Sequence, residues 1–262
     1  MRFLNQCRRV AVTVLLTLFA SLAFAQPSPV LQQTEQLLDW LGVSSLIDQT
    51  PMVLTTALDA EARARNATPQ QASAWRRQLE PRLQPRRLKL DLAHYVAERY
   101  RLETFRSADA LLQQPLAKRA RYFELAMTQP GAGRSLKDLR AGAHSEPTQA
   151  RRELVQEIDA ASASSALAAV LQTAITERVR LVAGSSAADE ASVQAQIDER
   201  QRYLAPLTQE YLLYAYRYLR DDELIAYRDL LRDASLQWLL DVGRQGILAT
   251  LAEVKPPPDS PR

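Results

Sequence analysis

The chain has 262 residues, of which 47% are hydrophobic and 24% are charged. This composition excludes an intrinsically disordered chain, which would carry too few apolar residues to build a core. The formal net charge of +3 comes from three arginines in the first 25 residues, because the other 30 basic residues balance 30 acidic ones, and this balance excludes nucleic-acid binding over much of the surface.

The first 25 residues have the pattern of a cleaved bacterial signal peptide. A positively charged start precedes an apolar run over residues 10–25, which ends in Ala-Phe-Ala before Gln26. The run has 16 residues, whereas a membrane-spanning helix needs about 20. The only cysteine, Cys7, has no lipobox before it and leaves with this segment, so the mature chain forms no disulfide. We therefore expect a periplasmic protein, secreted through a signal peptide at residues 1–25.

The rest of the chain predicts an all-α fold. Good helix formers dominate it, and no stretch alternates apolar and polar residues long enough for a strand, so we expect roughly ten helices. Thr50-Pro51 and Thr68-Pro69 each place a capping hydroxyl before a proline at the first helical position. Asp221, Asp222 and Glu223 place negative charge where the helix dipole favours it. Turns or connectors are expected at residues 130–133, 142–147 and 184–188.

Helical spacing of apolar residues predicts the buried faces. The clearest face consists of Leu167, Val170, Leu171, Ala174, Ile175, Val179 and Val182. Shorter stripes consist of Leu116, Ala120, Phe123 and Met127, of Leu224, Tyr227 and Leu231, and of Leu236, Leu239, Leu240, Ile247 and Leu251.

The order of these features suggests two similar bundle halves packed together, at residues 26–143 and 144–254, with a disordered tail at 255–262. Residues 37–41 resemble 154–158, and an aromatic helix followed by a cap at Ser107 or Asp221 occurs in both halves. The offset is about 115 residues, which is longer than a solenoid repeat and would indicate a duplicated bundle. Chance similarity between Leu-rich and Ala-rich helices is the other explanation.

Several blocks resemble a group of exported bacterial helical proteins, the domain-of-unknown-function family numbered 2059. The blocks are Arg77–Leu83, Tyr95–Tyr100, Leu116–Glu124 and Asp222–Tyr227. The family pattern is an acidic-capped Glu-Leu helix followed by a short Ser-Pro-x-Gly-basic turn. Here the turn at Gln129–Arg134 is one residue longer, and Asp233–Gln237 lacks the proline and the glycine. The resemblance implies a periplasmic helical domain and carries over no catalytic residues.

Asp91, His94 and Glu98 are spaced to share one helical face and are the nearest approach to a metal or acid–base site. A zinc site needs a third or fourth converging ligand, and ion pairing with neighbouring arginines explains these residues more simply. Neither a nucleophile elbow nor a phosphate-binding glycine loop occurs. We therefore assign no catalytic, cofactor or metal residues and lean against an enzyme.

Six tyrosines fall within 25 residues, at positions 203, 211, 214, 216, 218 and 227. Tyr211, Tyr214 and Tyr218 are predicted to share a helix face, which forms either the margin of the core or a surface for a partner or a sugar.

A basic stretch consists of Arg82, Arg86, Arg87, Lys89, Arg99, Arg101 and Arg106. Lys118, Arg119 and Arg121 lie near it if the helices form a hairpin. It is either a solvated helix face or a patch for anionic lipids or acidic polymers.

These observations favour a non-enzymatic envelope protein that binds an unknown envelope protein. The candidate interaction surface is Tyr211, Tyr214, Tyr218, Arg82, Arg86 and Arg87. The alternative is a carbohydrate-binding module or an envelope enzyme with a groove near the tyrosines. We expect no cofactor and no nucleic-acid partner, and membrane contact is possible but not favoured.

Overall fold

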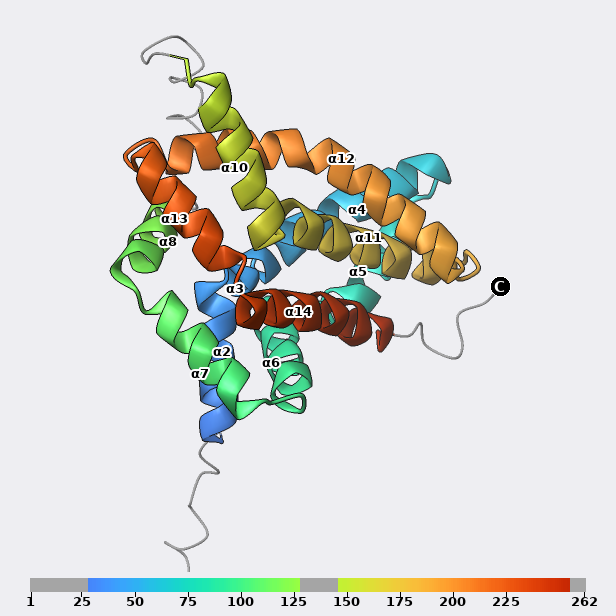
Figure 1. The fold of residues 1–262 in the computed structure, drawn as a ribbon. Coiled ribbons are helices and arrows are strands. Elements are labelled where there is room, and N and C mark those ends of the chain that lie inside the picture. Colours follow the sequence, from blue (N-terminus) through green and yellow to red (C-terminus); the bar gives the residue numbers. More distant parts are fainter. Residues whose placement is uncertain (1–27, 128–145, 255–262) are drawn as a thin grey trace, which may run out of the picture.

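The structure, a computed structural model, describes residues 28–127 and 146–254. The expected signal peptide, the turn at 130–133, His144 and the tail at 255–262 lie outside this part. All regular structure in the described residues is α-helical, as the sequence predicts. The first segment contains α2 (Pro29–Trp40), α3 (Val43–Ile47), α4 (Thr50–Ala64), α5 (Pro69–Leu79), α6 (Pro85–Ala97), α7 (Leu102–Leu112) and α8 (Pro115–Met127). The second contains α10 (Gln149–Ser162), α11 (Ser164–Val182), α12 (Glu190–Ala215), α13 (Asp221–Leu231) and α14 (Ala234–Ala252) (Figure 1).

Helix α5 begins as its sequence predicts. The Thr68 hydroxyl accepts a hydrogen bond from the backbone N–H of Gln71, and the Gln71 side chain accepts one from the backbone N–H of Thr68. Together these bonds satisfy two of the N–H groups that a helix start leaves free. The three acidic residues predicted at a helix start also lie in the first turn of α13.

Three other predicted caps are wrong, at Asp221, Thr50 and Ser107. Asp221 is the first residue of α13, and the cap of that helix is Arg220. Thr50 is the first residue of α4 rather than its cap, and its hydroxyl is buried without a hydrogen-bond partner. The reason is that Asp48 and Gln49 are already in the right-handed helical conformation, so Gln49 takes the cap position and Thr50 becomes the first residue of the helix. Ser107 lies in the middle of α7, because that helix begins at Leu102, six residues before the start at Ala108 that a cap at Ser107 would give.

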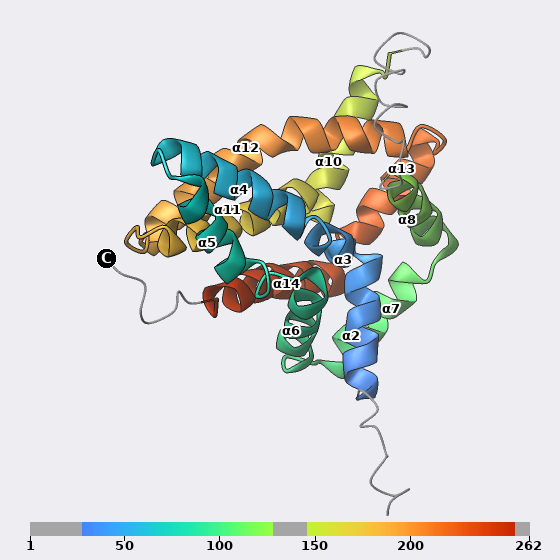
Figure 2. The same ribbon diagram turned by 180° about the vertical axis from the view of Figure 1, so that it is seen from behind.

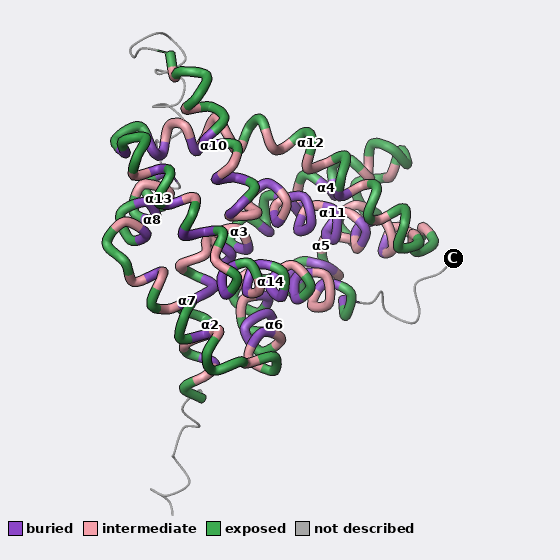
Figure 3. The backbone as a smooth tube through the Cα atoms, in the orientation of Figure 1, coloured by how far each residue is buried: buried purple, intermediate pink, exposed green. Residues whose placement is uncertain are grey.

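Helix α11 lies at the centre of the molecule and contacts α4, α5, α12 and α14. All seven apolar residues of its predicted face are buried, which confirms that face. Figure 3 shows the buried segments of α11 and α14 in the interior, whereas most of α12 is exposed or half-buried. The buried residues of both segments form one hydrophobic cluster, so residues 29–127 and 149–252 share a core.

The last helix of each segment packs against the other segment. Helix α8 contacts α12 and α13, while α14 contacts α6 and α7 (Figures 1 and 2). Helices α6 and α14 approach closely at Gly246, where a Cβ atom would lie 2.4 Å from Cδ1 of Leu92 and 2.9 Å from Cδ1 of Tyr95. The last helix of each segment is therefore packed against helices of the other segment, and we call this arrangement an exchange of α8 and α14.

Among the described residues, no single helix combines the length and the hydropathy needed to cross a membrane. The pair α10 and α11 passes that test only when taken together, with a bend of 51° between them.

Candidate functional site

The three predicted surface tyrosines do not share a helix face. Helix α12 ends at Ala215, so Tyr218 lies in the turn that follows it. The Tyr211 hydroxyl donates a 2.7 Å hydrogen bond to the backbone oxygen of Glu124, and this makes Tyr211 a packing residue. The guanidinium of Arg217 lies over the rings of Tyr214 and Tyr218, 3.8 and 4.3 Å from their centroids.

Only part of the tyrosine cluster is open to solvent. Tyr203 and Tyr218 are exposed, whereas Tyr216 and Tyr227 are buried. The ring of Tyr218 lies 6.0 Å from that of Phe123, between centroids.

The three predicted arginines lie elsewhere. Arg82 is in the turn between α5 and α6, and Arg86 and Arg87 are in the first turn of α6. All three are exposed, and Arg87 forms an ion pair with Asp91 at 3.6 Å. In Figures 1 and 2 the end of α12 lies beside α13 in the upper part of the molecule, while α6 lies in the lower part. The structure therefore does not join the arginines and the tyrosines in one surface.

The expected proximity of the basic residues of α8 is also wrong. Arg119 forms an ion pair with Glu223 of α13 at 2.6 Å, and Arg121 is buried beside Glu124. The physical reason is the packing of α8 against α12 and α13 rather than against α6.

The possible metal site on α6 gains no further ligand. His94 and Glu98 are exposed, Glu98 lies 3.7 Å from Arg99, and Asp91 lies 3.6 Å from Arg87. Within the described residues, no group of three or more histidine, cysteine or carboxylate side chains could hold a metal ion.

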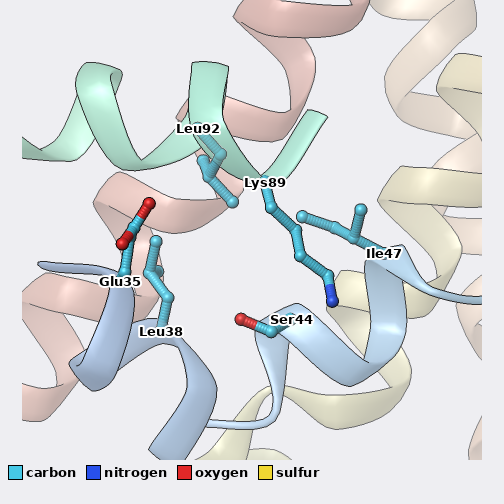
Figure 4. A pocket seen from close by; sticks show the side chains of 6 residues that line it. All are labelled: Glu35, Leu38, Ser44, Ile47, Lys89 and Leu92. Carbon is cyan, nitrogen blue, oxygen red and sulfur yellow. The ribbon is translucent and has the colours of Figure 1, made fainter. Parts of the chain in front are cut away.

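A cavity of about 110 Å³ lies where α2, α3 and α6 meet. Its lining residues are Glu35, Leu38, Ser44, Ile47, Lys89 and Leu92. Figure 4 shows Glu35 and Leu38 on α2, Ser44 and Ile47 on α3, and Lys89 and Leu92 on α6. Three apolar side chains, those of Leu38, Ile47 and Leu92, are buried there.

A wider surface groove of about 710 Å³ adjoins this cavity. Glu35 and Lys89 line both, and the groove adds Asp48, Gln84, Pro85, Arg86 and Leu90. Lys89 Nζ lies 2.6 Å from Asp48 Oδ2, so it holds the end of α3 against α6. Leu90 is 44% exposed although it is a large apolar residue. We call the cavity and the groove together the α2–α3–α6 groove.

The α2–α3–α6 groove combines an apolar floor with a rim of both charges. Such an arrangement fits an apolar side chain with polar neighbours, as in the buried centre and polar rim of a protein interface. The Ser44 hydroxyl forms no hydrogen bond to Lys89 or to any other described residue, and Lys89 is held by Asp48.

A second polar cluster, which we call the Glu124 cluster, lies under α8. Oε1 of Glu124 accepts hydrogen bonds from the hydroxyls of Tyr216 at 2.6 Å and Tyr227 at 3.1 Å, and Oε2 pairs with Arg121 Nη1 at 3.2 Å. Arg121 Nη2 donates a 2.7 Å hydrogen bond to Ser45 Oγ. Sequence spacing did not find this cluster, because its members come from α3, α8, α13 and the end of α12.

The Glu124 cluster keeps its phenols protonated. Burial, and then the nearby Glu124 carboxylate, raise the pKa of Tyr216 and of Tyr227 well above their usual value. The same two causes raise the pKa of Tyr211 to about 12, partly opposed by Arg121. Because protonated phenols donate and the carboxylate accepts, the phenols and the carboxylate satisfy one another and fix α8 to the second segment.

No protein-family model, curated protein or solved structure matches this chain.

Proposed function

We propose that the protein is an exported, non-enzymatic interaction protein of the bacterial envelope, which binds a partner protein through the α2–α3–α6 groove. The observation that carries the proposal is the apolar cavity between Leu38, Ile47 and Leu92 beside the exposed Leu90. An apolar cavity beneath a rim of both charges resembles the buried centre and polar rim of a protein interface. The partner inserts an apolar side chain and places charges against Glu35 and Arg86 on the rim.

The periplasmic location and the internal duplication belong to the same proposal. The first rests on the signal-peptide pattern of residues 1–25. The second is supported by the exchange of α8 and α14 between the two segments. Membership in the family numbered 2059 stays a prediction from sequence resemblance.

The alternative, a carbohydrate-binding module or an enzyme near the tyrosines, has less support. Tyr211, Tyr216 and Tyr227 are used in hydrogen bonds to Glu124. The α2–α3–α6 groove, which offers room for a ligand, is not lined by a tyrosine.

Site-specific photo-crosslinking in intact cells tests the proposal. The crosslinking residue replaces Leu90 in the groove and, as the control, Ile225 on α13, which has the same exposed fraction of 44%. We expect a discrete protein adduct at Leu90 and not at Ile225.

A second pair of variants decides whether the cavity holds the partner. Ser44→Leu fills the cavity with an apolar side chain and should abolish the adduct, whereas Ser107→Leu on the exposed face of α7 should leave it unchanged. Circular dichroism checks that both variants fold. Equal adducts at Leu90 and Ile225, or an adduct that survives Ser44→Leu, would overturn the proposal. An adduct removed by glycan-degrading enzymes would favour the carbohydrate alternative.

A further inference from the structure

A separate cleft of about 480 Å³ lies between α14 and the segment of residues 98–101, which joins α6 to α7. One wall is Glu98, Arg99, Tyr100 and Arg101, and the other is Trp238, Asp241, Val242 and Gln245. The α14 residues have i, i+3, i+4, i+7 spacing, so they form one helix face. The cleft shares no lining residue with the α2–α3–α6 groove, and its volume lies in the range of small-molecule sites.

The Arg101 side chain is positioned by an aromatic contact and has no anionic partner among the described residues. Its guanidinium lies over the ring of Trp238, 5.0 Å from the centroid, and it forms no ion pair with any described residue. Trp238 is itself fixed by an edge contact with the buried Phe105, at 6.1 Å between ring centroids. The indole therefore orients the guanidinium and leaves its N–H groups available to an anion.

The guanidinium of Arg99, unlike that of Arg101, already has a hydrogen-bond acceptor and an anionic neighbour. It lies 3.5 Å from the centroid of the Tyr95 ring, donates a 2.8 Å hydrogen bond to the backbone oxygen of Tyr95, and has Glu98 at 3.7 Å. Arg101 is thus the better candidate to bind a ligand.

The α14 wall carries one negatively charged side chain, that of Asp241. Asp241 accepts a 2.8 Å hydrogen bond from Gln245 and lies 3.7 Å from Arg244. A carboxylate has about four acceptor positions, so Asp241 keeps capacity for a further donor. A doubly charged anion such as phosphate would be repelled by Asp241 and Glu98.

We propose that this cleft binds a zwitterionic ligand, an amino acid or a short peptide, with its carboxylate on Arg101 and its ammonium group on Asp241. The bidentate geometry of a guanidinium suits a carboxylate. The two walls together carry two positive and two negative side chains, which match a ligand with one charge of each sign. This site is independent of the partner-binding groove proposed above.

The test is an NMR titration of the whole mature chain with alanyl-alanine as the probe. The chain has three tryptophans, and Trp238→Phe assigns the indole N–H signal of Trp238. We expect alanyl-alanine at millimolar concentration to shift that signal and to leave those of Trp40 and Trp75 in place. N-acetylation or amidation of the dipeptide removes one charge, and each change should weaken binding about tenfold. Inorganic phosphate should give no saturable shift.

Three variants complete the test. Arg101→Gln and Asp241→Asn should each weaken binding of alanyl-alanine about tenfold. Arg106→Gln is the control, because Arg106 is an exposed arginine of α7 outside the cleft. No shift of the Trp238 signal, equal binding of the blocked dipeptides, or full binding by Arg101→Gln in a chain with an unchanged circular dichroism spectrum would overturn the proposal.

Discussion

The hydroxyl of Tyr216 donates a 2.6 Å hydrogen bond to Oε1 of Glu124, 92 residues away in the chain. Tyr216 follows the end of α12 and is buried, while Glu124 lies on α8, so the bond joins the two segments of the fold. Arg121, also buried, has this same carboxylate as its anionic partner. The Glu124 carboxylate thus pairs with one guanidinium and accepts hydrogen bonds from two phenols at once, although Nε of Arg121 stays buried without a partner among the described residues.

Glu124→Ala should therefore lower the free energy of unfolding by about 3 to 5 kcal/mol, because it leaves the Arg121 charge buried without a partner. Urea unfolding followed by circular dichroism measures the change. Glu103→Ala is the matched control, since the Glu103 side chain is 84% exposed, and its effect should stay within about 0.5 kcal/mol. A loss no larger than that of the control would contradict the structural role of the Glu124 cluster.

Stability should fall at alkaline pH. The pKa values of Tyr216 and Tyr227 are raised in the folded chain by burial and by Glu124. Their stabilising contribution is therefore fully present below the unfolded value of about 10 and is lost as the pH rises above it, by about 1.4 kcal/mol per pH unit for each phenol.

The comparison of Tyr216→Phe with Tyr203→Phe isolates this effect. Urea midpoints measured from pH 8 to pH 11 should decline less steeply in Tyr216→Phe, which removes one of the titrating groups. Tyr203 is 72% exposed, so Tyr203→Phe should follow the parent chain. Identical slopes in the two variants would count against the raised pKa.

Two glycines of α14 should respond to alanine with opposite signs. At Gly246 the new Cβ would meet Leu92 and Tyr95 of α6 at less than 3 Å, so these side chains must shift within a packed core, at a cost of about 1 to 3 kcal/mol. At Gly243 the nearest atom is Cδ2 of Leu38 at 4.0 Å, so alanine fits and gains about 0.5 to 1 kcal/mol from helix propensity. Thermal unfolding of both variants checks the signs, and a stabilised Gly246→Ala would refute the close approach of α6 and α14.

Arg151 closes the turn after α12. Its Nη2 donates hydrogen bonds to the backbone oxygens of Tyr216 at 2.8 Å and Leu219 at 2.9 Å, and its Nη1 pairs with Asp221. Arg151→Ala leaves both oxygens without this donor and should cost about 1 to 3 kcal/mol. Arg152→Ala, at the exposed neighbouring position, should be nearly neutral in the same chemical denaturation experiment. Equal stabilities of the two variants would exclude this role for Arg151.

Much of the helical architecture was predictable because its causes are local. The buried face of α11 follows from the spacing of its apolar residues, and the start of α5 follows from Thr68 and Pro69. The predicted face with Tyr211, Tyr214 and Tyr218 failed at a helix end, since no strong stop signal marks Ala215. The role of Glu124 was not predictable, because nothing near it in the chain indicates that two tyrosines about 100 residues away would reach it.

The sequence by itself determined that this protein is helical, which face of α11 is buried, and that its charge balances after residue 25. These properties depend on propensity, periodicity and composition, each of which is read within a few turns of chain. Only the tertiary structure decided that α8 and α14 cross to the opposite segments. Those crossings create the Glu124 cluster and the cleft between Arg101 and Trp238. The reason is that such sites depend on which helices become neighbours, and amphipathic helices with similar apolar faces do not specify their neighbours by spacing alone.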